Sequence, residues 1–260
     1  MSKKSVLRIT LAFSAIAILG MITVLCALVI LFPDDNQDYY NYPNFSLQPE
    51  MGSYLIDPET IFDSLNNGET DTFVPNLGQI DGGLPDVVFE KPINWKQSDY
   101  LMIAKALNQY VWKDTLGGWE LYEMSFFLDC HDNPSGFERS FMTYFKTISS
   151  YGEKKIYAVR DFSILPKYAY VEWRGGKNYP RPLFGWKRID FETLHINAED
   201  ALRIAEENGG KNIRLEFNNN CRIKVFLVPE INTRWRVWYS VEGIPELELV
   251  IDPLTGKIID

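Results

Sequence analysis

Asp129, Cys130, His131 and Asp132 bring a thiol, an imidazole and two carboxylates together in consecutive positions. A cysteine nucleophile needs a base within hydrogen-bond distance. Neighbouring residues of a strand point to opposite faces, which would separate Cys130 from His131. The stretch 133–136, Asn-Pro-Ser-Gly, follows directly and is typical of a turn. We therefore interpret this cluster as the polar end of a hairpin and not as a catalytic site.

The remaining composition offers little further material for catalysis. The 260 residues include only two histidines and three scattered cysteines, too few for a zinc site or a dense disulfide framework. His195 lies between Leu194 and Ile196 and is interpreted as structural. The sequence therefore predicts a protein that is not an enzyme and that uses neither a metal nor another cofactor.

A second candidate site is the stretch 173–188, where basic and aromatic side chains alternate without an acidic residue. Basic groups pair with carboxylates or phosphates, and aromatic rings stack on sugars, so one hypothesis is a surface for an anionic polymer or glycan. Gly175-Gly176 and the prolines at 180 and 182 favour the other hypothesis, a linker between two units. The candidate binding residues are Trp173, Arg174, Lys177, Tyr179, Arg181, Trp186, Lys187 and Arg188.

Cys130 and Cys221 form the only candidate disulfide that we consider. Such a bridge would close a loop of about 91 residues and contribute roughly 4–5 kcal/mol in the chain-entropy model. Each cysteine falls on the apolar face of a predicted strand in a different unit. We therefore expect two buried free thiols, with the disulfide as the alternative.

The elements that position these residues begin with an apolar stretch, 9–32, of 24 residues without a charge. As a helix it would reach roughly 36 Å, enough to cross a hydrocarbon core about 30 Å thick. Three basic residues precede it within 1–8 and three acidic residues follow within 34–38. The sequence predicts a single-pass protein of the cell membrane, with residues 1–8 cytoplasmic and the rest of the chain outside. A cleaved signal peptide is the alternative, but its apolar stretch is usually only about 7–15 residues.

The stretch 33–90 has a charge of −12, from twelve acidic residues and no Lys or Arg, whereas 91–260 contains 23 of each sign; with three basic residues before 33, the net charge is −9. Six prolines and one-signed charge favour an extended stalk. Seven aromatic residues in 39–73 leave open whether parts of the stalk pack onto the remainder.

Two successive patterns of a helix followed by strands divide the remainder into the units 91–190 and 191–260. Ser98 is the predicted cap of a helix with an apolar stripe from Tyr100 to Val111, and Asn197 is the predicted cap of a second helix that ends at Asn208-Gly209-Gly210. Alternating residues predict several short strands after each helix. The expected fold class is α+β: an N-terminal transmembrane helix, then tandem units, each of one helix packed on a curled antiparallel sheet.

The stretches 197–205, 235–239 and 250–258 together follow the pattern of a known small module. Through them, residues 197–260 resemble a PepSY domain, a module of peptidase propeptides and of many secreted or membrane-anchored bacterial proteins. The resemblance covers 64 residues and lies in three stretches, whereas the first unit shares only the order of its elements. It implies an extracytoplasmic location, no chemistry of its own, and a role in restraining peptidases or regulating the cell envelope. Asp252 and Gly256 match the family pattern and are expected to shape a turn. The three stretches are 197–205 (NAEDALRIA), 235–239 (WRVWY) and 250–258 (VIDPLTGKI).

The expected function is therefore that of a membrane-anchored, non-catalytic PepSY-like protein that binds or regulates another envelope protein, such as a peptidase. Exposed strand edges would accept an extended peptide as an added strand. One alternative is an accessory regulator of a cell-wall sensor kinase, contacted through 9–32. The other is a polymer- or glycan-binding module that uses 173–188. Nucleic acid is not an expected partner, since the sequence pI is near 4.9.

Overall fold

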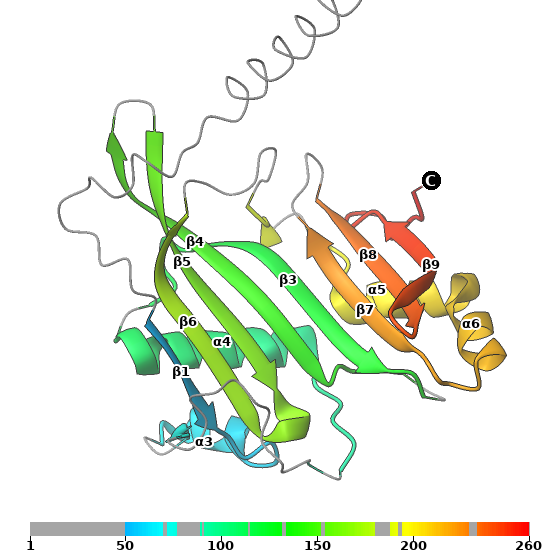
Figure 1. Cartoon of the computed structure of the whole chain (residues 1–260), viewed down its shortest axis with the longest axis horizontal. Helices are drawn as coiled ribbons and strands as arrows, with labels where there is room; N and C mark the ends of the chain where they lie inside the picture. Colours follow the sequence, from blue (N-terminus) through cyan, green and yellow to red (C-terminus); the bar gives the residue numbers. More distant parts are fainter. Residues whose placement is uncertain are drawn as a thin grey trace, which may run out of the picture. The chain divides into compact units, whose positions relative to one another are not determined.

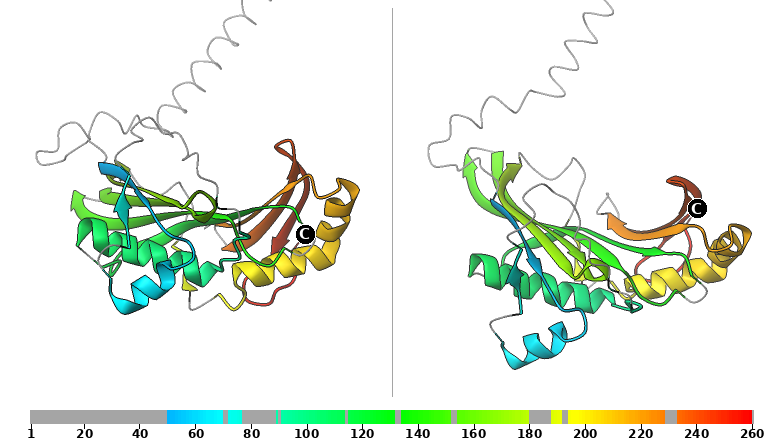
Figure 2. Two further views of the ribbon diagram at one scale, coloured as in Figure 1. Left: turned by 90° about the horizontal axis from the view of Figure 1, so that it is seen from below. Right: turned by 60° about the horizontal axis from the view of Figure 1, so that its bottom comes forward.

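A computed structural model describes residues 50–69, 72–76, 89, 91–113, 115–131, 134–151, 154–179, 188–191, 194–228 and 233–259. These residues form one nine-stranded antiparallel sheet in the order β2-β1-β6-β5-β4-β3-β7-β8-β9 (Figure 1). Helices α4 and α5 lie on the same face of the sheet (Figure 2). The strands are β1 (Glu50–Leu55), β2 (Val74–Pro75), β3 (Glu120–Asp129), β4 (Arg139–Tyr151), β5 (Lys154–Leu165), β6 (Tyr170–Tyr179), β7 (Arg222–Val228), β8 (Arg234–Val241) and β9 (Ile244–Ile251).

Helix α4, Gln97–Trp112, confirms the predicted apolar stripe. Tyr100, Ile103 and Leu107 are fully buried against the sheet. The helix begins two residues before the predicted start, because its cap is Lys96 and not Ser98. The backbone N–H of Lys96 donates to the Asp99 carboxylate at 2.8 Å, so an acidic residue inside the first turn caps the helix. The apolar stripe thus determines which face of α4 is buried, and the cap determines where α4 begins.

Helix α5, Ala198–Ala205, starts where the sequence predicts. The side chain of Asn197 accepts a hydrogen bond from the backbone N–H of Asp200 at 2.8 Å. The predicted end is wrong, because the chain only kinks at Gly209, where φ is +118°, and continues as α6, Lys211–Glu216. Gly210 lies so close to Tyr239 that an added Cβ would be 2.2 Å from its hydroxyl. Because Gly210 has no side chain, the backbone after the kink packs directly against Tyr239 of β8.

The pairing of β3 with β7 overturns the predicted fold class of tandem units. The two strands run antiparallel, from Met124 opposite Leu227 to Asp129 opposite Arg222, in one continuous sheet. A single hydrophobic core includes side chains from α4 and β3 together with side chains from α5 and β7. The units 91–190 and 191–260 therefore share one sheet and one core. Alternation along each strand identifies its buried face but not the strand that lies beside it, which is why the sequence did not predict this pairing.

The first residues of α4 and α5 cap one another. The backbone N–H of Gln97 donates to the Glu199 carboxylate, and the side-chain oxygen of Gln97 accepts from the backbone N–H of Ala198 at 2.8 Å. Backbone N–H groups at a helix start have no partner within their own helix. Each helix thus supplies an acceptor that the other helix needs.

A disulfide joins Cys130 and Cys221 at one end of the β3–β7 pair. Their Cα atoms are 5.2 Å apart, and the backbone N–H of Cys130 donates to the carbonyl of Cys221 at 3.0 Å. The expectation of two free thiols in separate cores is therefore wrong. Both cysteines are buried, as expected, but the pairing of their strands places them side by side.

Part of the predicted stalk belongs to the sheet. Residues 50–55 form β1, which pairs with β6, and α3, Ile61–Asn67, follows. Phe73 is buried, and Tyr54 packs against both Phe73 and Tyr110 of α4 at centroid distances of 6.1 and 5.3 Å. Among the aromatic residues that argue against a fully extended stalk, Tyr54, Phe62 and Phe73 are described, and these three pack in or against the core. Residues 33–49 and 77–88 lie outside the described residues.

The predicted single-pass topology also requires correction. Among the residues that the structure describes, no helix has both the length and the apolar composition needed to cross a bilayer. The stretch 9–32, for which the sequence predicts the crossing, and residues 1–8 lie outside the described part.

The disulfide should contribute strongly to stability. Replacing Cys130 and Cys221 together by alanine should lower the free energy of unfolding by about 4 kcal/mol, because the bridge restricts the unfolded chain over a separation of 91 residues. Denaturant unfolding measures the difference, and Cys26→Ala is the control, since it leaves the bridge intact. A loss below about 1 kcal/mol would contradict this assignment.

The reciprocal cap should also be measurable. Gln97→Ala removes the acceptor of the Ala198 N–H and should lower the free energy of unfolding by about 1 kcal/mol. Gln109→Ala makes the same change at an exposed position of α4 and should stay within about 0.5 kcal/mol of the parent. Equal effects of the two substitutions in thermal or urea unfolding would show that the contact between the helix starts contributes nothing.

Candidate protein-binding edge

The candidate residues of 173–188 do not form one surface in the described part of the chain. Trp173 of β6 packs beneath α4, with its ring 5.1 Å from that of Trp112, whereas Arg174 is the next residue of the strand and lies on the opposite face. Arg188 is exposed and pairs with Glu120 at 3.3 Å. Lys177 and Tyr179 belong to the end of β6, and Arg181, Trp186 and Lys187 lie outside the described residues.

The stretch that begins at Asp129 contains no available thiol, because Cys130 is in the disulfide. Asp129 ends β3 and lies within ion-pair distance of Lys167, at 3.2 Å, and of Arg222, at 3.7 Å. The backbone carbonyl of His131 accepts from Arg214 at 2.7 Å. These contacts agree with our interpretation of a polar strand end. Asp132 is not among the described residues.

Sequence analysis missed a buried ion pair in the α6 region. Arg214 is only 3% exposed, and its guanidinium donates to both carboxylate oxygens of Glu206. Tyr239 of β8 donates to the same carboxylate at 2.7 Å, and burial together with this carboxylate raises the pKa of the Tyr239 hydroxyl. All three side chains have partners, so the cluster fastens the kinked helix to the sheet. The only sequence signal is an acidic and a basic residue on either side of Gly209-Gly210.

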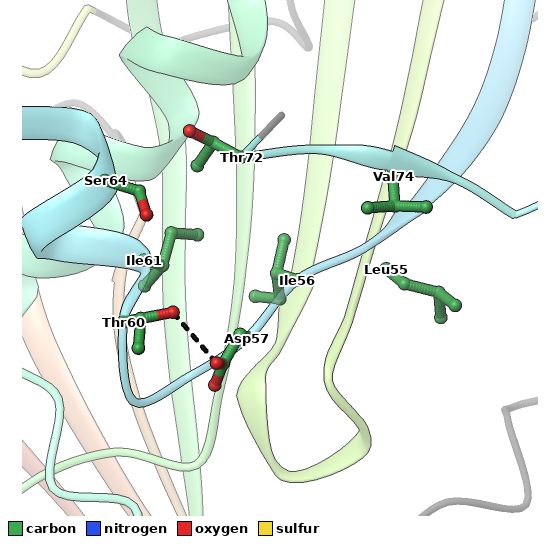
Figure 3. A pocket seen from close by; sticks show the side chains of 8 residues that line it. All are labelled: Leu55, Ile56, Asp57, Thr60, Ile61, Ser64, Thr72 and Val74. Atoms are coloured by element: carbon green, nitrogen blue, oxygen red, sulfur yellow. Dashed lines mark hydrogen bonds between the residues drawn. The ribbon is translucent and has the colours of Figure 1, made fainter. Parts of the chain in front are cut away.

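A hollow of about 300 Å³ lies between β1, β2 and α3 (Figure 3). Its one charged side chain, Asp57, accepts from the Thr60 hydroxyl at 2.8 Å, the bond drawn dashed, and from the backbone N–H of Glu59 at 2.9 Å. Both bonds belong to the turn before α3. Ile56, Ile61 and Val74 supply apolar walls. The hollow therefore has no acid and base pair. Across the described residues, no group of three or more His, Cys, Asp or Glu side chains could hold a metal ion.

Strand β9 forms an edge of the sheet and is the candidate binding site for another chain. Ile251, at its end, is fully buried where it pairs with Ile258, which follows the turn. Leu247 and Leu249 lie on the same face of β9 as Ile251 but are only half-buried. The residues that pair with the end of β9 thus help to cover Ile251. None of the described residues pairs with the outer side of β9 at Leu247 and Leu249, and these two side chains stay partly exposed.

The turn after β9 places residues 257–259 beside the strand. The Asp252 carboxylate accepts from the backbone N–H groups of Leu254 and Thr255, and these bonds lower its pKa. Gly256 has φ +69°, a conformation that glycine adopts most readily. The interpretation of Asp252 and Gly256 as turn-forming residues is confirmed.

The outward backbone groups of β9 follow from the bonds to this turn. The Val250 carbonyl accepts from the N–H of Ile259, and the Asp252 N–H donates to the carbonyl of Lys257, both at 2.8 Å. In a strand, residues two apart direct their backbone groups to the same side. The N–H and C=O of Glu248 therefore also face outward.

The other half of β9 is closed to strand addition. The register shifts between Tyr239 and Ser240, which leaves Glu246 as an extra residue in β9, and Pro245 has no N–H to donate. Such features limit uncontrolled pairing at sheet edges. The open part of the edge is therefore Leu247–Leu249, with two half-buried leucines on the helix face and the Glu248 carboxylate on the other.

No family model matches the chain. No curated protein matches it either. Among solved structures, the chain is similar to a crystal structure of a MaoC-like dehydratase from Phytophthora capsici, with 12% identity, 83% of this chain and 93% of that chain covered, and a TM-score of 0.21. A likeness at this TM-score supports neither a shared fold nor a shared reaction. The PepSY resemblance of 197–260 and the absence of catalysis stay predictions.

Proposed function

We propose that this protein is a non-catalytic binding protein that takes a short extended segment of another protein onto the edge of β9. The observation that carries the proposal is the difference between Ile251, which is fully buried beside Ile258, and Leu247 and Leu249, which are half-buried at a position where none of the described strands pairs with the outer side of β9. An added strand would receive backbone hydrogen bonds from the edge and cover the two leucines. A peptidase is the partner class that the PepSY resemblance implies.

The side chains of the edge specify the chemistry of this segment. Its residues on the helix face would contact Leu247 and Leu249 and should be apolar. On the opposite face lies the exposed carboxylate of Glu248, which already pairs with Arg236 at 2.8 Å, and the extra residue Glu246 beside it is also exposed. Like charges directly across a strand pair are unfavourable, which disfavours a second copy of β9 as the occupant. The segment should therefore alternate basic and apolar residues.

Amide exchange tests this edge directly. In the protein alone, the Glu248 amide should exchange with solvent quickly, and those of Leu247 and Leu249 should exchange slowly, because only the latter two face β8. A soluble peptide of alternating lysine and valine should slow exchange at Glu248. A peptide of alternating glutamate and valine is the matched control and should leave Glu248 unprotected. Slow exchange at Glu248 without any peptide would contradict the open edge.

A charge substitution distinguishes binding at the edge of β9 from a general electrostatic attraction between the peptide and the protein. Glu246→Lys should weaken binding of the lysine–valine peptide about 3–10-fold, since it places a cation beside the incoming strand. Glu216→Lys makes the same change in net charge at an exposed position of α6 and should leave the affinity unchanged. Titration followed by fluorescence anisotropy gives both values, and equal losses in the two variants would reject β9 as the site.

N-methylation of the peptide tests whether backbone bonds are used. Methyl groups on the amides that face β9 remove donors to the Glu248 carbonyl and should abolish protection of Glu248. Methyl groups on the alternate amides leave those donors intact and should preserve protection. Protection that survives both patterns would show that the peptide does not bind as an added strand.

A further inference from the structure

The face of the sheet opposite α4 and α5 carries a row of side chains that crosses the β3–β7 pair. Arg139 of β4 is opposite Phe127 of β3, and Phe127 is opposite Lys224 of β7. Lys224 is in turn opposite Trp238 of β8, which is opposite Glu248 of β9. We call the first four residues of this alternation, Arg139, Phe127, Lys224 and Trp238, the cation–aromatic row.

The two cations of the row lie against the rings and not against carboxylates. The Arg139 guanidinium is 5.2 Å from the centre of the Phe127 ring, and the Lys224 ammonium is 4.4 Å from the Phe226 ring and within 5.6 Å of Trp238. Throughout the described ranges, no carboxylate lies within ion-pair distance of either cation. Neighbouring cations differ, since Arg222 pairs with Asp129 and Arg236 pairs with Glu248.

Lys224 is the less hydrated of the two cations. Its side chain is half-buried, and burial lowers the pKa of its ammonium group, an effect that the more distant Glu123 carboxylate partly offsets. Burial also raises the pKa of the Glu123 carboxyl group, and this carboxylate is not within ion-pair distance of Lys224. Rings attract a cation less strongly than a carboxylate in direct contact does. A bound anion would therefore interact favourably with Lys224.

A hollow of about 900 Å³ lies beside the row, at the end of the sheet that carries the disulfide. This volume is typical of pockets for small organic ligands. Phe127, Arg139, Lys224 and Trp238 line it, so both cations and two of the rings reach the same space. The indole N–H of Trp238 is buried and has no acceptor within the part of the chain that the structure describes.

The acidic residues of the hollow limit the charge of its ligand. Asp129 and Glu242 also line the walls, and Asp129 already faces Arg222. A polyphosphate or a strongly acidic polymer would meet these carboxylates at close range, whereas one negative charge can be placed at Lys224 and Arg139. Flat apolar groups suit the Phe127 and Trp238 rings. The lining therefore favours a monoanion with an apolar or aromatic body.

We propose that this hollow is a binding site for a small organic carboxylate, with the carboxylate held by Lys224 and Arg139 and the apolar body placed against Phe127 and Trp238. The site is separate from the strand-binding edge, because its ligand contacts side chains of the open face and not the outward backbone of β9. A free acid and the C-terminal carboxylate of a peptide share this chemistry.

The test compares an acid with its neutral amide on the full chain. 3-Phenylpropanoate should bind the parent protein in a calorimetric titration, and 3-phenylpropanamide should bind at least tenfold more weakly because it lacks the charge. The tripeptide Gly-Gly-Phe, with a free or an amidated C-terminus, repeats the comparison for a chain end. Tighter binding of the acid than of its amide in either pair supports the site. The pair that shows this difference identifies whether the carboxylate comes from a free acid or from the end of a peptide. Equal binding of acid and amide in both pairs, or no binding of either acid at millimolar concentration, overturns it.

Substitutions then locate the binding. Lys224→Met keeps an unbranched apolar side chain and should weaken binding of the acid at least tenfold, and Arg139→Gln, at an exposed position, should weaken it severalfold without loss of the fold. Lys211→Met is the matched control on α6 and should leave the affinity unchanged. Unchanged binding in both row variants overturns the assignment. Glu246→Lys should not affect acid binding, so failure at this site and failure at the edge of β9 are distinguishable.

Discussion

The antiparallel pairing of β3 with β7 is the constraint on which the rest of the structure depends. Six residue pairs join the strands, from Met124 and Leu227 to Asp129 and Arg222. Their alternation places Met124 and Phe126 in the same core as Val225 and Leu227, all fully buried. A shift of register by one residue would move the apolar side chains of one strand to the opposite face. The burial of apolar side chains from both strands therefore determines the register of the pair.

Polar and covalent contacts reinforce this pairing from both ends. At the helix starts, Gln97 and Glu199 each satisfy a backbone N–H of the other helix, and at the strand ends Cys130 is bonded to Cys221. The buried Arg214 adds a bond from α6 to the His131 carbonyl just beyond β3. Because these contacts join residues more than 80 positions apart, they restrict the relative movement of the two halves of the sheet.

Local sequence signals predicted the elements better than their association. The apolar stripe of α4, the Asn197 cap and the Asp252 turn were predicted because each depends on residues within a few positions. The kink at Gly209 was taken for a helix end, because a glycine pair permits either outcome and the contact of Gly210 with Tyr239 decides between them. The pairing of β3 with β7, and with it the disulfide, depends on residues about 90 positions apart, for which alternation gives no partner.

The same limit applies to clusters of side chains on the surface of the sheet. Trp173 and Arg174 are neighbours in the sequence of β6, yet Trp173 packs against the core and Arg174 lies on the opposite face of the sheet. Arg139, Phe127, Lys224 and Trp238 form a row only because four strands are in register, so no sequence window contains them. Clustering of basic and aromatic residues along the chain is therefore a poor guide to clustering on a sheet.

The register also explains why no carboxylate of the described residues lies within ion-pair distance of Lys224 or Arg139. Glu248 lies in the same row as Lys224, but the Trp238 position separates them, and Arg236 holds the Glu248 carboxylate at 2.8 Å. Asp129 is similarly engaged by Lys167 and Arg222 at the far end of β3. Glu248 and Asp129 are thus already paired with other cations, while aromatic rings lie beside Lys224 and Arg139 at the hollow. Because Arg236 pairs with Glu248 and Arg222 pairs with Asp129, neither carboxylate lies within ion-pair distance of Lys224 or Arg139, which leaves these two cations available to an anion in the hollow.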